Sequence, residues 1–118
     1  MEKSQLDEFG EILVSNVRDK TIGHWERVVM GTMKDSESQQ IFRELNKLDV
    51  DTKNLIQSLV YKVTDTTLHY LLWTIEQNEG LDVTLNQRAL KNLSDGLAGE
   101  LYTEDGWIGR FTKKAFDK

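Results

Sequence analysis

The chain has 118 residues, a net charge of −5 and no cysteine. This length fits one domain, so we expect a single helical domain over residues 1–118. Without cysteine, disulfides, thiolate metal sites and a cysteine nucleophile are excluded. Acidic charge repels phosphate backbones, and no apolar run reaches the roughly 18 residues of a membrane span. We therefore expect a cytoplasmic protein that binds neither nucleic acid nor membrane.

The first predicted helix begins after Ser4, whose hydroxyl suits an N-cap. Apolar residues then recur at helical spacing at Leu6, Phe9, Ile12, Leu13 and Val17. The pattern weakens at residues 21–23, where we expect a kink, and a helical stretch over residues 24–33 continues it.

A second helix is predicted after the capping pair Ser36 and Gln39, in which each side chain reaches a backbone N–H of the other. Its apolar stripe consists of Ile41, Phe42, Leu45 and Leu48. The polar stretch that follows contains Asp51, which we expect to cap the next helix.

Residues 52–78 carry the strongest helical pattern, and we expect Gly80 to end that helix. The apolar residues fall in two sets on different faces, with the change near residues 63–67. Either Asp65 caps a new helix there, or one long helix changes the neighbour against which it packs. We favour the single helix, which would lie centrally in a bundle.

The last third is predicted to start with a short extended piece at residues 81–85. Thr84 and Gln87 then form a second capping pair before a helix reaching about residue 102, and Asp105-Gly106 indicates a turn. Residues 107–111 would form either a strand or a helical turn. As a strand, they would pair with residues 81–85.

Together these patterns predict a mainly α fold, an irregular bundle of four or five helices. A short two-stranded β-ribbon near the C-terminus is the further expectation. The chain has no proline, which agrees with long uninterrupted helices.

Two hypotheses for the function follow from the polar residues, and the first is a small metal-dependent or acid–base enzyme. Asp65, His69 and Glu76 share one helical stripe, and His24 could join them from another helix. The competing interpretation is a set of surface pairs, because helix-bundle metal sites usually repeat Glu-x-x-His and this chain has only two histidines. We expect no bound cofactor.

The second hypothesis concerns residues 99–111, GELYTEDGWIGRF, where acidic and aromatic residues gather. As a structural element, the aromatics would anchor the C-terminal segment on the bundle. As a recognition surface, Tyr102, Glu104, Asp105 and Trp107 would meet a basic partner, because aromatics dominate interfaces and acidic rims speed encounter.

The run SDGLAGELYTEDGWIGRF, with LHYLLWTIEQ before it, resembles a small bacterial family of uncharacterised proteins. Its members end in a similar Asp-Gly-Leu…Glu-Asp-Gly-Trp pattern. The resemblance covers the last third of the chain and implies no catalytic or binding residue.

We favour a non-enzymatic protein-interaction module over the enzyme. Its partner would be another protein, as for an inhibitor or immunity protein, or a second copy of the chain. Self-association is favoured by three tryptophans and a two-faced long helix, which offer more apolar surface than one small bundle needs.

Overall fold

The computed structural model describes residues 4–103 and 105–114 and confirms a mainly α fold with a small β-ribbon. The helices are α1 (Gln5–Leu13), α2 (Asp19–Met30), α3 (Ser36–Leu45), α4 (Val50–Gln77) and α5 (Trp107–Phe111). The strands are β1 (Thr84–Leu85) and β2 (Arg88–Ala89), which pair in antiparallel fashion. Within the described ranges, no helix combines the length and apolarity that crossing a bilayer requires.

The first two helices form one continuous rod, because a π-helical turn at Val14–Arg18 joins α1 to α2. Ser4 caps the rod as predicted, by accepting a hydrogen bond from the Asp7 amide at 3.0 Å. The kink predicted at residues 21–23 is wrong: the helix runs on to Met30 and ends at Gly31, whose φ of 79° suits a residue without Cβ.

The π-helical turn changes which side chains face inward. Val14 and Arg18 are buried, whereas Val17 of the predicted apolar stripe is 44% exposed. Ile12, which precedes this turn, is also 44% exposed. A π turn holds more residues than an α turn and therefore rotates the stripe that a regular 3.6-residue period predicts.

Two of the predicted N-caps are displaced towards the N-terminus. Asp35, and not Ser36, caps α3 by accepting from the Ser38 amide at 3.0 Å. Asp49, and not Asp51, caps α4 by accepting from the Thr52 amide at 2.7 Å. At each site an acidic side chain lies just before the expected cap and takes the same role.

The single long helix is confirmed, since α4 is continuous through Asp65. It ends at Gln77, and Asn78 is extended, so Gly80 is not the left-handed cap that we expected.

The predicted helix over residues 85–102 is wrong. Asn86 and Gln87 both have positive φ, 52° and 71°, and form the tight turn between β1 and β2 instead of a capping pair. Two 3₁₀ turns follow, at Leu90–Leu93 and Ala98–Leu101. Residues 107–111 form the helical turn α5, so the ribbon that we expected between residues 81–85 and 107–111 does not form.

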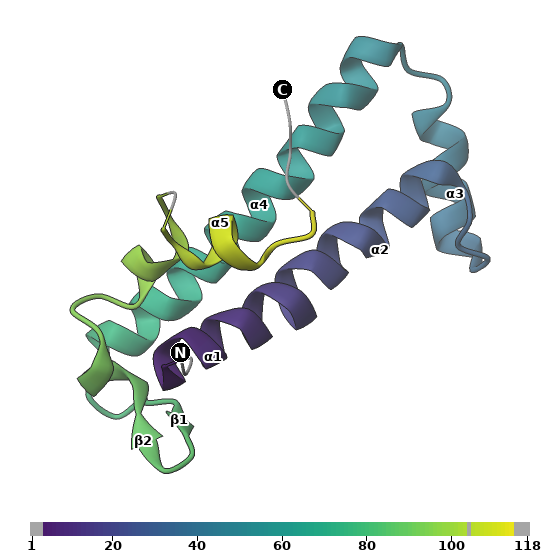
Figure 1. Ribbon diagram of the computed structural model, residues 1–118. Helices are drawn as coiled ribbons and strands as arrows, with labels where there is room; N and C mark the ends of the chain where they lie inside the picture. Colours follow the sequence, from purple (N-terminus) through teal and green to yellow (C-terminus); the bar gives the residue numbers. More distant parts are fainter. Residues whose placement is uncertain (1–3, 104, 115–118) are drawn as a thin grey trace.

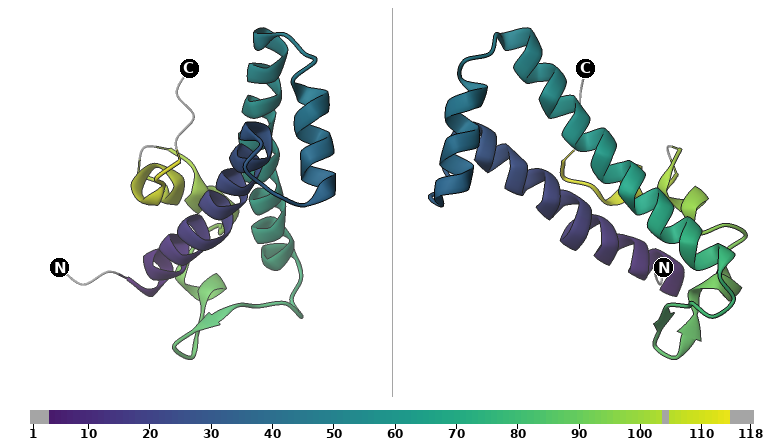
Figure 2. Two further views of the ribbon diagram at one scale, coloured as in Figure 1. Left: turned by 90° about the vertical axis from the view of Figure 1, so that its right-hand side faces the viewer. Right: turned by 180° about the vertical axis from the view of Figure 1, so that it is seen from behind.

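The rod α1–α2 and the helix α4 lie close together at one end and diverge towards the other, where α3 spans the gap (Figures 1 and 2). The main core lies at the closed end. It contains Leu13, Val14, Leu68, Leu72, Ile75, Leu90, Leu97, Ala98, Leu101 and Trp107. The molecule is elongated, with extents of 49 × 29 × 23 Å.

Trp107 packs its ring flat against the rod at Gly10, and a Cβ on Gly10 would overlap that ring. We therefore expect Gly10→Ala to lower the free energy of unfolding by about 1–2 kcal/mol, although alanine favours helix. Gly23→Ala is the matched control, because its Cβ would meet its nearest neighbour, Arg27 Nη1, at an ordinary 3.6 Å.

Gly23→Ala should stabilise the protein by up to about 1 kcal/mol. Urea denaturation followed by circular dichroism measures both changes. If Gly10→Ala and Gly23→Ala changed the free energy of unfolding in the same direction, that result would contradict the packing of Trp107 on Gly10.

Candidate interaction surface

The divergence of α2 and α4 leaves an apolar groove of about 520 Å³. At the open end of the molecule, α3 contributes Ile41 and Leu45 to its lining. It is lined by Val17, Thr21, Trp25, Val28, Val29, Ile41, Leu45, Ile56, Leu59, Val60, Val63, Thr64, Thr67 and Leu68. None of these 14 residues is charged. We call this the α2–α4 groove.

The few polar groups of the α2–α4 groove are mostly engaged with their own helix. The Thr64 hydroxyl donates to the Val60 carbonyl and the Thr67 hydroxyl to the Val63 carbonyl, each at 2.7 Å. The groove therefore presents methyl and methylene groups to an occupant, with little that could recognise a polar small molecule.

One border of the groove is an exposed ridge on α4, formed by Leu55, Leu59 and Val63. Their spacing of four residues places them on successive turns of one face. Their side chains are 60%, 47% and 61% exposed, although all three are large and apolar. An apolar ridge of this length along a helix is unusual on a surface without a partner.

The open end of the molecule has an incomplete core. The stripe that we predicted on α3 is only half-buried at Ile41, Phe42 and Leu45, and Leu48 is exposed. Ser38 is the one buried residue of α3, at 8% exposure. Side chains that would normally lie between packed helices therefore line a surface here.

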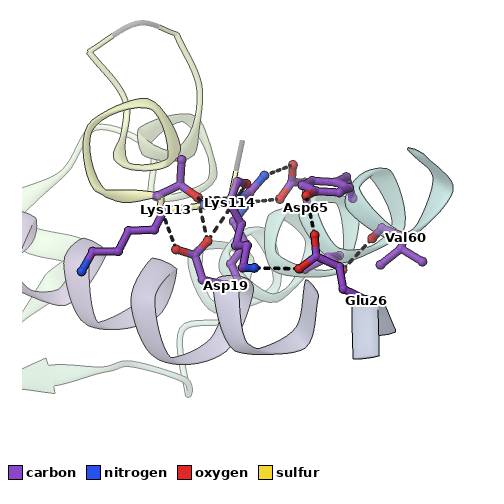
Figure 3. Close-up of polar contacts among 10 residues, drawn as sticks. Asp19, Glu26, Val60, Asp65, Lys113 and Lys114 are labelled. Carbon is purple, nitrogen blue, oxygen red and sulfur yellow. Dashed lines mark hydrogen bonds and ion pairs between the residues drawn. The ribbon is translucent and has the colours of Figure 1, made fainter. Parts of the chain in front are cut away.

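Arg18 joins the rod to α4 through Asp65, which is labelled in Figure 3 together with Asp19 and Lys114. Its side chain is 96% buried, and its Nε donates to Asp65 Oδ1 at 2.6 Å. The guanidinium also donates to the Thr112 hydroxyl and the Lys114 carbonyl, each at 2.8 Å. One cation thereby joins three segments that are far apart in the sequence.

Two carboxylates on α2 complete this Arg18 network. Asp19 accepts from the Lys113 amide and the Thr112 hydroxyl, each at 2.7 Å, and Glu26 pairs with the Lys114 ammonium at 2.7 Å. The bond with Glu26 raises the pKa of Lys114, and burial, followed by the charge of Glu26, raises the pKa of Tyr61. The network therefore joins the rod to α4 and to residues 112–114.

The residues of the predicted metal site lie on α2 and α4 but do not form a ligand set. Asp65 is paired with Arg18, and Glu76 accepts a hydrogen bond from the Ala98 amide. The His24 ring packs edge-on against Trp25, and the His69 ring lies between Tyr70 and Tyr102. In the part of the chain that the structure describes, no three His, Asp or Glu side chains gather to hold a metal ion.

The predicted C-terminal recognition residues are divided by the fold. Tyr102 and Asp105 are exposed, whereas Trp107 is completely buried and offers no surface to a partner. Trp107 is instead the anchor that we considered, with its ring edge-on to Phe9. Glu104 lies outside the described residues. Tyr102 is only 41% exposed, and the burial of the remainder, followed by the charges of Asp65 and Tyr70, raises its pKa.

The fold and this surface define a small helical protein with an open apolar groove. No protein-family model matches the chain, and neither a curated protein nor a solved structure shows a significant match. The resemblance of the last third to a bacterial family stays a prediction.

Proposed function

We propose that this chain is a protein-interaction module that binds an amphipathic helix in the α2–α4 groove. The observation that supports this most directly is the groove itself, with its 14 uncharged lining residues and the exposed ridge beside it. Helix-in-groove recognition uses such surfaces, because the apolar face of the entering helix supplies anchors at successive turns.

The incomplete core around α3 favours a helical occupant. Ile41 and Leu45 of α3 line the groove together with residues of α2 and α4, so that all of its sides are helices. A third helix lying between two helical walls buries apolar side chains on both sides, as in helix bundles. The acidic C-terminal surface, with Tyr102 and Asp105 exposed, stays a separate prediction for a basic partner.

A photo-crosslinking amino acid placed at Val63 tests the proposal in a lysate of the source organism. We expect covalent adducts of discrete mass from position 63, because that side chain lies on the rim of the groove. Leu81 is the control position: it is exposed and does not line the groove.

Adding Leu59→Lys to the protein that carries the crosslinker should abolish those adducts, since a charge would enter an apolar contact. If position 63 gave no adduct, or the same adducts as position 81, the groove would not be the site of interaction.

A further inference from the structure

The chain carries both halves of a helix-in-groove contact on one surface. The ridge of Leu55, Leu59 and Val63 lies on α4, which is also a wall of the groove. In a two-fold symmetric pair, each copy presents the same surface to the other, so the ridge of one copy can enter the groove of its partner. A surface with ridge and groove side by side suits this arrangement.

The exposed area of the chain is larger than that of a compact monomer. A folded monomer of 13.7 kDa exposes about 6,600 Å², whereas this chain exposes 8112 Å². Its radius of gyration is 16.8 Å, against about 13.5 Å for a compact domain of 118 residues. The difference of about 1,500 Å² is larger than the roughly 800 Å² that a standard interface covers on each partner.

The charges beside the groove are also complementary. On the α3 side, the adjoining hollow that shares Ile41 and Leu45 with the groove contains Glu37 and Glu44, of which Glu44 pairs with Lys47. On the α4 side, the hollow that shares Val63 and Thr67 contains Lys62. A second α4 lying in the groove would bring its lysine border towards the acidic border of α3, which favours that orientation.

We propose that the occupant of the α2–α4 groove is α4 of a second copy, so that two copies form a symmetric dimer with α2 and α4 of each at its centre. This inference rests on the proposed function and names the partner. The dimer buries the ridge and completes the core at the open end of each copy.

Light scattering on the purified protein gives the first test, with Leu59→Lys and Leu81→Lys as a matched pair. The two leucines are 47% and 46% exposed, so neither substitution disturbs a buried side chain. We expect a wild-type dimer, an unchanged Leu81→Lys dimer, and a dissociation constant raised about 30-fold or more by Leu59→Lys. Circular dichroism checks that all three proteins are folded.

A single cysteine gives a second test that does not weaken the contact. The natural chain has none, so Val63→Cys introduces the sole thiol. Because both copies place position 63 in the shared interface, a bifunctional maleimide with a spacer of about two helical turns should link the two chains of Val63→Cys. It should not link those of Leu81→Cys.

Three results would overturn the dimer. A wild-type protein that is monomeric at every concentration up to its solubility limit would do so, and so would a dimer that Leu59→Lys leaves intact. In either case the proposed function survives if crosslinks from position 63 reach a different protein. Native mass spectrometry showing one chain with a small apolar molecule, lost in Leu59→Lys, would overturn both proposals.

Discussion

Replacing Arg18 with alanine is expected to lower the free energy of unfolding by about 3 kcal/mol. The substitution leaves Asp65 and Asp19 without their shared cation, and removing one partner of a buried ion pair costs far more than an exposed pair contributes. We take the lower end of the usual range because Asp65 is partly open to water. Urea denaturation followed by circular dichroism measures the change.

Lys47→Ala is the control for Arg18→Ala. Its ammonium pairs with Glu44 at 2.8 Å, close to the Arg18–Asp65 distance, but both side chains are exposed. We expect no measurable loss of stability, because water screens such pairs. Arg18→Lys should fall between the two, since a lysine keeps the charge but cannot contact all the partners of the guanidinium. If Arg18→Ala and Lys47→Ala lowered the free energy of unfolding equally, burial of the Arg18 network would contribute nothing to stability.

The long helices follow from the sequence because their signals are local. The apolar period of residues 52–78 predicted one helix, and α4 extends over nearly that range. The caps were harder to place, since an aspartate and a second polar residue compete at each start and both can accept a backbone N–H. Asp35 and Asp49 took these positions.

Residues 85–102 show that helical spacing of apolar residues does not by itself establish a helix. Their leucines recur at intervals of three to five residues, which suits a helix, yet they fold into a hairpin and two 3₁₀ turns. The turn depends on two consecutive positive φ angles at Asn86 and Gln87. Asn-Gly is the usual sequence for this turn, and glutamine carries no such signal.

The interaction surface could be predicted only in part. The two-faced pattern of α4 indicated surplus apolar surface, and the structure places that surplus on the ridge and in the groove. No sequence pattern marked Arg18 as a buried residue, because an arginine within an amphipathic helix usually lies in solvent. Its partners Asp65 and Thr112 are 47 and 94 residues away, and only the fold brings them together.

Replacing Trp107 with alanine should lower the free energy of unfolding by about 4 kcal/mol, the largest effect that we expect from any single change in this chain. Trp107 is the largest fully buried side chain and joins α5 to the rod and to the main core. Its loss leaves a cavity beside Phe9 and Gly10 of α1, which the surrounding structure closes only in part.

Trp73→Ala is the matched control, because that indole is 47% exposed on α4 and should contribute little. Trp107→Phe should cost less than Trp107→Ala, since it keeps a ring in the cavity. If Trp73→Ala were as costly as Trp107→Ala, the core would not be centred at the closed end.

A double-mutant cycle tests the packing of Trp107 on Gly10 directly. In the wild-type background the new methyl group of Gly10→Ala overlaps the indole and destabilises the protein. In the Trp107→Ala background the same methyl group enters the cavity, and the helix gains the propensity of alanine, so Gly10→Ala should become stabilising. The change of sign corresponds to a coupling of about 2 kcal/mol or more, within the range measured for residues in contact. A Gly10→Ala effect that is equal in both backgrounds would mean that the indole does not lie on this face of the rod.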